Sequence, residues 1–199
     1  MRLAYQKPTI TLLTLLLWLA LSACTAAAPE LRGTEYSEPR QTPAFTLQNA
    51  AGEAVSLETY RGKVVPIYFG YTFCPDVCPL TMANLARVQS QMDDAGDDLQ
   101  VLMITVDPQR DSATVVQDYV ASFHPTFTGL SGTEEQIAEA AAPFGVFYEK
   151  AEGSEATGYL VDHTARIFVI DKRGALRATY SYDASVEDLA ADMRTLIAE

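Results

Sequence analysis

The sequence predicts an α/β fold in which a central mixed sheet is flanked by helices. Strand-like and helix-like segments alternate through the middle of the chain, and this order implies parallel strands with helices on both faces. Two strand-like segments around residues 171–174 add antiparallel strands to the sheet. Two cysteines, Cys74 and Cys78, lie where the first apolar strand passes through a tight connection into a helix.

An added N-terminal β-hairpin is expected before that strand. Apolar and polar residues alternate at 45–47 and at 55–57, on either side of Asn49-Ala50-Ala51-Gly52. The continuous apolar run at 64–69 then predicts a buried strand that breaks at Gly70.

The next helix begins close to the cysteines. Pro79 suits its first position, where the missing N–H costs nothing, and we expect the helix to end at Gly96. Its apolar residues recur at three- and four-residue steps: Leu80, Ala83, Leu85, Val88 and Met92. Unpaired amides and the positive end of the helix dipole stabilise a thiolate, so we expect a lowered pKa for at least one thiol.

The alternation continues through the second half of the chain. Strands are expected at 99–106 and 127–130. Ser112 can cap the helix between them, whose expected inner residues are Val115, Val116, Tyr119, Val120 and Phe123. Thr133-Glu134-Glu135-Gln136 fits a capping box and opens a helix that stops near Pro143.

The C-terminal part is expected to add an extended segment, a polar loop, a hairpin and a helix. The extended segment is expected at 146–150 and the polar loop at 151–158. The hairpin is expected to pair strands 165–170 and 176–182 around the turn Asp171-Lys172-Arg173-Gly174. The final helix is expected to be capped by Ser185 and Asp188, and its expected buried residues are Leu189, Met193, Leu196 and Ile197.

Residues 1–23 are typical of a signal peptide. Arg2 and Lys7 give a positive start, and the apolar run at 10–21 is too short to span a bilayer comfortably. Leu21-Ser22-Ala23-Cys24 looks like a bacterial lipobox, which predicts that Cys24 becomes a lipidated first residue. An uncleaved N-terminal anchor is the alternative. In both cases we expect a membrane-anchored domain on the extracytoplasmic face, periplasmic or outer.

A flexible tether is expected to separate this anchor from the domain. Residues 25–43 are rich in Ala, Pro, Ser, Thr and Glu, without periodic apolar residues, and would reach roughly 25 Å as a coil. The folded domain is then expected at 44–199. The net charge is −12, from 14 Lys+Arg and 26 Asp+Glu, and there is no basic stripe, which argues against nucleic-acid binding.

If Cys24 carries lipid, Cys74 and Cys78 remain as a pair. A spacing of four at a helix start places their β-carbons about 5–6 Å apart on one face. That is close enough for a disulfide after a small adjustment, or for two thiolates to hold one metal ion. A purely structural disulfide between Cys74 and Cys78 is the alternative, although a loop this short would constrain the unfolded chain little.

The element order, with paired cysteines after the first core strand, resembles a thioredoxin-like fold. In such folds the loop before the strand at 165–170 lies beside the cysteine turn, so His163 can reach the sulfurs. Two thiolates and one imidazole suit copper in either oxidation state, and zinc less exclusively. The other histidine, His124, follows an amphipathic helix and is expected to be structural.

Three motifs carry a more specific resemblance. They are Tyr68-Phe69-Gly70-Tyr71-Thr72-Phe73-Cys74-Pro75-Asp76-Val77-Cys78-Pro79, Val106-Asp107-Pro108-Gln109-Arg110-Asp111 and Tyr159-Leu160-Val161-Asp162-His163-Thr164. In this order they resemble the Sco (SenC) family, the copper chaperones of cytochrome c oxidase assembly. The resemblance runs from about Phe45 to the C-terminus.

Family membership would make Cys74, Cys78 and His163 the copper ligands. It would also make the client the oxidase subunit that carries the CuA site, with an upstream donor protein supplying the copper. The resemblance equally permits a thiol–disulfide reductase that uses Cys74 and Cys78 as its redox pair, because a metal-binding dithiol is also a redox couple.

A peroxidase of the peroxiredoxin type would share the fold and the cysteine at the helix start. Such proteins carry a Thr-x-x-Cys pattern at this turn. Here Tyr71 lies three residues before Cys74, and Pro75 lies three residues before Cys78, so the hydroxyl is missing.

Three aspartates lie near these motifs. Asp76 could tune the charge of the cysteines, orient a ligand or cap the helix. Asp107 ends a core strand on the same sheet edge and could support the site, although Asp-Pro is also common in turns. Asp162 is expected to be solvated, and none of the three is expected to be a ligand.

Overall fold

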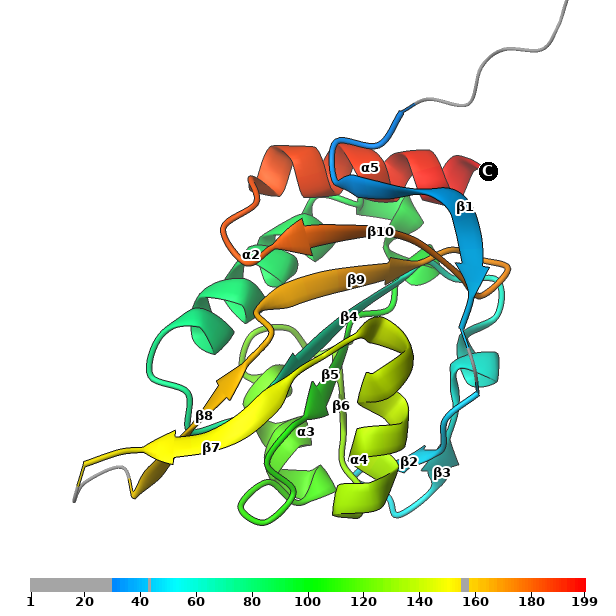
Figure 1. The fold of residues 1–199 in the computed structure, drawn as a ribbon. Helices are drawn as coiled ribbons and strands as arrows, with labels where there is room; N and C mark the ends of the chain where they lie inside the picture. The colour runs from blue at the N-terminus through cyan, green and yellow to red at the C-terminus, as the bar shows by residue number, and fades with distance from the viewer. Residues whose placement is uncertain (1–29, 43, 155–157) are drawn as a thin grey trace, which may run out of the picture. The chain divides into compact units, whose positions relative to one another are not determined.

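The computed structural model describes residues 30–42, 44–154 and 158–199. Its centre is a six-stranded mixed sheet with the strand order β1-β10-β9-β4-β5-β6 (Figure 1). The strands are β1 (Thr34–Gln41), β4 (Val65–Gly70), β5 (Leu102–Thr105), β6 (Thr128–Leu130), β9 (Arg166–Ile170) and β10 (Ala175–Ser181). Helices flank this sheet, so the predicted α/β architecture is confirmed.

Within the described residues, four α-helices pack on the sheet: α2 (Val77–Ser90), α3 (Ala113–Ala121), α4 (Glu134–Ala141) and α5 (Val186–Ala198). In Figure 1, α2, α3 and α5 lie behind the sheet and α4 lies in front of it. Short 3-10 helices are η1 (Leu57–Tyr60), η2 (Asp93–Asp98) and η3 (Ala142–Phe144). The expected caps are confirmed, since Ser112, Thr133 and Ser185 each accept a backbone N–H, and Thr133 forms a complete capping box with Gln136.

The strand that leads to the cysteines is the centre of the core. Every residue of β4 is buried, and β4 pairs in parallel with β5 and antiparallel with β9. Because β4 and β5 run parallel, with Gly70 opposite Thr105, their carboxyl ends lie at the same end of the sheet. The tight connection after Gly70 and the connection after Thr105 therefore lie side by side.

Of the three strand pairs that follow one another along the described parts of the chain, two were expected as hairpins. β2 (Leu47–Gln48) pairs with β3 (Ala54–Val55), and β9 pairs with β10. The third, formed by β7 (Tyr148–Glu152) and β8 (Tyr159–His163), was not expected as a paired element. It is a separate two-stranded sheet, and His163 is the last residue of its second strand rather than part of a loop.

The limits of the cysteine-bearing helix differ from the prediction. α2 begins at Val77, so Pro79 is its third residue, which still lies among the N–H groups without an intrahelical partner. It ends at Ser90 rather than Gly96, because Asp93 takes a positive φ of 47° and the 3-10 helix η2 follows.

Two residues expected on inner helix faces are exposed. Leu80 is 46% exposed and Val115 is 40% exposed. The buried face of α2 runs instead through Cys78, Met82 and Leu85, so Leu80 projects to the side.

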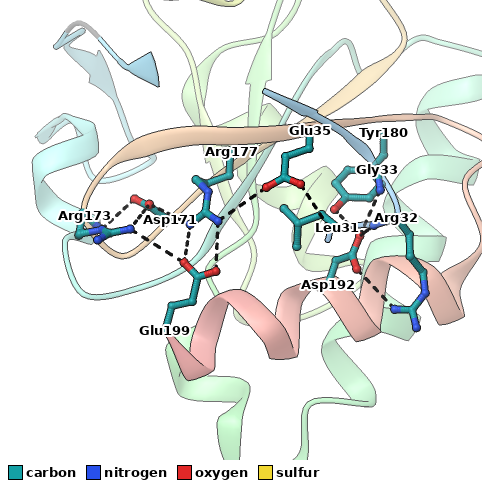
Figure 2. Close-up of polar contacts among 10 residues, drawn as sticks. All are labelled: Leu31, Arg32, Gly33, Glu35, Asp171, Arg173, Arg177, Tyr180, Asp192 and Glu199. Atoms are coloured by element: carbon teal, nitrogen blue, oxygen red, sulfur yellow. Dashed lines mark hydrogen bonds and ion pairs between the residues drawn. The ribbon is translucent and has the colours of Figure 1, made fainter. Parts of the chain in front are cut away.

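The expected tether at 25–43 is wrong for residues 34–41, and the domain begins earlier than 44. β1 pairs antiparallel with β10, and Leu31 before it is buried. The carboxylate of Asp192 on α5 accepts hydrogen bonds from the Arg32 and Gly33 amides at 2.6 and 3.2 Å (Figure 2).

A row of buried charges continues from this contact along α5 and β10. Asp192 also accepts the Tyr180 hydroxyl at 2.8 Å, and burial together with this carboxylate raises the pKa of Tyr180. Arg177 pairs with Asp171 and with Glu199 at the end of α5 (Figure 2). Each buried charge therefore has an opposite charge or a hydrogen-bond donor, which the low dielectric of a protein interior requires.

In the part of the chain that the structure describes, no helix is both long and apolar enough to cross a membrane.

Candidate metal centre

The two cysteines occupy different environments at the end of β4. Cys74 lies in the connection and is half-buried, whereas Cys78 is the second residue of α2 and is fully buried. Both are free thiols in the structure. Gly70 makes this packing possible, because a β-carbon there would lie 2.9 Å from the Cys78 Sγ and 2.7 Å from the Tyr68 ring.

His163 reaches the sulfurs from β8. Its Nε2 lies 3.4 Å from the Cys78 Sγ, and its ring packs edge-on against the rings of Tyr68 and Tyr71 at centroid distances of 5.9 and 5.8 Å. These contacts fix the plane of the imidazole. Ligand atoms of Cys74, Cys78 and His163 all lie within 4.8 Å of one another. The structure thus brings together the three residues that the sequence singled out.

The pKa values of the two thiols are shifted in opposite directions. The Cys78 thiol donates a hydrogen bond that lowers the pKa of Cys74, with smaller contributions from His163 and from the backbone amides at Asp76 and Cys78. Burial raises the pKa of Cys78, and the neighbouring Cys74 raises it further. The lowered thiol pKa falls on Cys74, and its first cause is the partner cysteine rather than the helix end.

The cysteine connection is held by a carboxylate that we did not single out from the sequence. Asp111 is fully buried and accepts hydrogen bonds from the Thr72 amide and hydroxyl at 2.9 and 2.5 Å. It also accepts the Thr105 hydroxyl at 2.8 Å. Asp111 therefore fixes the connection two residues before Cys74. Its place in the Val106–Asp111 motif was the available signal.

Asp107 lies at the predicted sheet edge, but its carboxylate is already engaged. It is buried, pairs with Arg110 and accepts the Tyr159 hydroxyl at 2.6 Å. Asp107 therefore holds Tyr159, the first residue of β8, which is the strand that ends at His163.

The remaining candidates lie outside the cluster of ligand atoms. Asp76 is exposed and occupies the N-cap position of α2, where its side chain makes no capping hydrogen bond. Asp162 is exposed, as expected. His124 contacts Thr126 and the Phe127 ring in the turn after α3, which agrees with the structural role expected for it. Cys24 lies outside the described residues.

The donor set fits a soft metal ion. Zinc–sulfur bonds of about 2.3 Å place two ligand atoms of one ion at most roughly 4.6 Å apart. The three ligand atoms here lie within 4.8 Å of one another, so a small adjustment lets them share one ion. The Nε2 atom of His163 is the nitrogen that faces the sulfurs, as its contact with the Cys78 Sγ shows. Its Nδ1 atom is buried and has no hydrogen-bond partner among the described residues. Two sulfurs and one imidazole suit copper better than a hard cation.

Fold and site together define a thioredoxin-like domain with a dithiol–imidazole site at the end of its central strand. A family model described as SCO1/SenC matches residues 33–198. A SCO2-like protein of Rickettsia prowazekii is 33% identical over 146 residues, which are 73% of this chain and 71% of that protein. The chain belongs to the SCO1/SenC family.

Solved structures agree with this assignment. The apo Sco1 protein from Thermus thermophilus is 40% identical, with a TM-score of 0.77 over 86% of this chain and 99% of that chain. Arabidopsis thaliana ScoI with copper bound is 31% identical, with a TM-score of 0.74 over 79% of this chain and 99% of that chain. The thioredoxin-like fold is thereby confirmed.

Proposed function

We propose that this protein is a membrane-anchored copper metallochaperone that delivers copper to the CuA site of cytochrome c oxidase. The observation that carries the proposal is the convergence of Cys74, Cys78 and His163 in a member of the SCO1/SenC family. These residues would supply two thiolates and one imidazole to a single copper ion. The related Arabidopsis protein, whose structure contains copper, supports copper as the metal.

The exposure of the site suits transfer to another protein. Cys74 is only half-buried, and Phe73 beside it is 55% exposed, so a partner can approach the site from the side of Cys74. The CuA centre also offers thiolates and imidazoles. Exchange between two such sites replaces each ligand by one of its own kind, and therefore needs no large drop in free energy.

Anchoring through Cys24 completes the proposal. Lipidation of this residue after removal of residues 1–23 would place the domain on the extracytoplasmic side of the membrane, where the CuA site of the oxidase is expected. Mass spectrometry of membrane-extracted protein should find diacylglycerol on Cys24, whereas an intact Met1 terminus would contradict this step.

A deletion strain tests delivery. Loss of the gene should lower CuA content and oxidase activity while the haem centres remain, and excess copper should partly restore activity. Variants Cys74→Ser, Cys78→Ser and His163→Ala should each fail to complement. Normal CuA content in a copper-limited deletion strain would overturn the oxidase assignment.

A second function, reduction of the disulfide between the CuA-site cysteines, is favoured by the lowered pKa of Cys74. The Cys74 thiolate would attack the client disulfide and form a mixed disulfide. Cys78 would lose its proton and displace the client dithiol, leaving a Cys74–Cys78 disulfide that a separate thiol reductant must reduce. Under this alternative, His163→Ala should retain most activity and an added thiol reductant should replace the protein. The same variant therefore separates the two functions.

A further inference from the structure

Among the described residues, the strand that carries His163 does not pair with the sheet whose strand β4 leads to the cysteines. β7 and β8 form their own two-stranded sheet, whereas β4 belongs to the central one. Main-chain pairing anchors the end of β8 through β9, which begins three residues after His163 and pairs with β4. The start of β8 lacks such an anchor in the described part of the chain, so side-chain contacts are needed to hold it against the cysteine connection and to set how His163 meets the sulfurs.

Arg110 makes contacts on both sides. It lies in the connection between β5 and α3, and its guanidinium carbon is 3.7 Å from the centroid of the Tyr159 ring. The same carbon is 4.9 Å from the Phe73 ring and 5.7 Å from the Tyr71 ring. Tyr159 is the first residue of β8, and Phe73 immediately precedes Cys74.

Hydrogen bonds fix the orientation of the guanidinium. Its Nη1 donates to the Tyr159 carbonyl oxygen at 3.0 Å, and its Nε donates to the Asp107 carboxylate. The Tyr159 hydroxyl donates to the other oxygen of that carboxylate at 2.6 Å. Asp107, Arg110 and Tyr159 thus form a closed ring of contacts, and the side chain of Asp107 is only 1% exposed.

We propose that Arg110 is a positioning residue for the third copper ligand. By holding the start of β8 against the aromatic residues of the cysteine connection, it sets where His163 at the end of β8 meets the two sulfurs. Arginine suits this role because its planar fork donates to two acceptors while its face stacks on rings. The inference rests on the proposed ligand set, but it does not depend on the identity of the client.

A double-mutant cycle on the full chain tests this inference. Copper affinity and the thiolate–Cu(II) charge-transfer band are measured anaerobically for the wild type, Arg110→Ala, His163→Ala and the double variant. Loss of a residue that orients a ligand commonly weakens metal binding about 10–100-fold. We expect a loss of about 10-fold for Arg110→Ala, with a band shifted toward that of His163→Ala. In the His163→Ala background, Arg110→Ala should cause no further loss.

Arg61→Ala is the matched control. Arg61 also pairs with a carboxylate three residues earlier, Glu58, but on the surface, so its loss should leave copper affinity and the band unchanged. Arg110→Lys should regain only part of the affinity, because lysine lacks the planar fork. If Arg110→Ala does not fold by circular dichroism, the cycle is run with Arg110→Lys, for which we expect a loss of at least about threefold.

Two results would overturn the inference: an unchanged charge-transfer band in the Arg110 variant, or equal losses of affinity with and without His163. Wild-type protein that binds no copper would overturn the ligand set as well, so the two failures can be told apart.

Discussion

At the scale of single residues, the site contains two thiols of opposite character. Cys74 is partly exposed and accepts a hydrogen bond that stabilises its thiolate, while Cys78 is buried and holds its proton. The sequence spacing predicted that the sulfurs would be neighbours. It could not predict which one would ionise first, because that depends on how deeply α2 is buried.

Reactivity against pH should show this difference. Because the pKa of Cys74 is lowered in the folded state, its thiolate persists as pH falls below the ordinary thiol value of about 8.5. Alkylation of Cys74 in the reduced, metal-free protein should therefore stay fast at neutral pH and slow only in acid, while Cys78 remains largely unmodified. Cys78→Ala removes the donor and should move the rate profile toward higher pH. A wild-type profile centred near 8.5 would contradict the assignment.

Gly70 gives a second prediction at this scale. A β-carbon there would collide with the Cys78 Sγ and the Tyr68 ring, neither of which can move freely in the packed core. Gly70→Ala should lower the thermal midpoint of unfolding. It should also weaken copper binding at least about 10-fold, because the added methyl group displaces the Cys78 sulfur from its position as a ligand. Gly96→Ala is the control, because its β-carbon would meet only the end of the flexible Gln89 side chain. Equal copper affinity in both variants would count against this packing role.

At the scale of elements, the described helices and central strands agree with the sequence pattern, whereas two strands were missed. Strand β8 was not predicted because its five residues include the polar Asp162 and His163. Its partner β7 also lies on the other side of a loop that was expected to be polar. Strand β1 was not predicted because residues Thr34–Gln41 are mostly polar, as is common for an edge strand exposed to water.

Attachment of β1 can be tested through Asp192. Its buried carboxylate accepts two amides and the Tyr180 hydroxyl, so Asp192→Ala should cost about 2–3 kcal/mol of unfolding free energy. In the same variant, the backbone amides of residues 31–41 should exchange hydrogen faster than in the wild type. Asp188→Ala on the same helix removes only an exposed ion pair with Arg32 and should cost less than about 1 kcal/mol. Unchanged exchange in Asp192→Ala would mean that other contacts hold the strand.

At the scale of the whole molecule, the sequence allowed the ligand residues to be predicted, but not the long-range contacts that hold the surrounding elements in place. Cys74, Cys78 and His163 follow from spacing, fold and family resemblance. The contacts of Asp192 with Arg32 and of Arg110 with Tyr159 join residues 160 and 49 positions apart, and no local pattern reveals such pairs. The same limit applies to Asp111, whose carboxylate crosses 39 positions to reach Thr72.

The most direct test of the central claim is anaerobic copper titration of the reduced full chain beside its His163→Ala variant. The wild type should bind one copper ion per chain and show a thiolate–Cu(II) charge-transfer band, and the variant should bind far more weakly with a shifted band. Prior oxidation of Cys74 and Cys78 to a disulfide should abolish binding, because a disulfide sulfur is a poor ligand. Copper held equally well by the variant or by the oxidised protein would contradict the site described here.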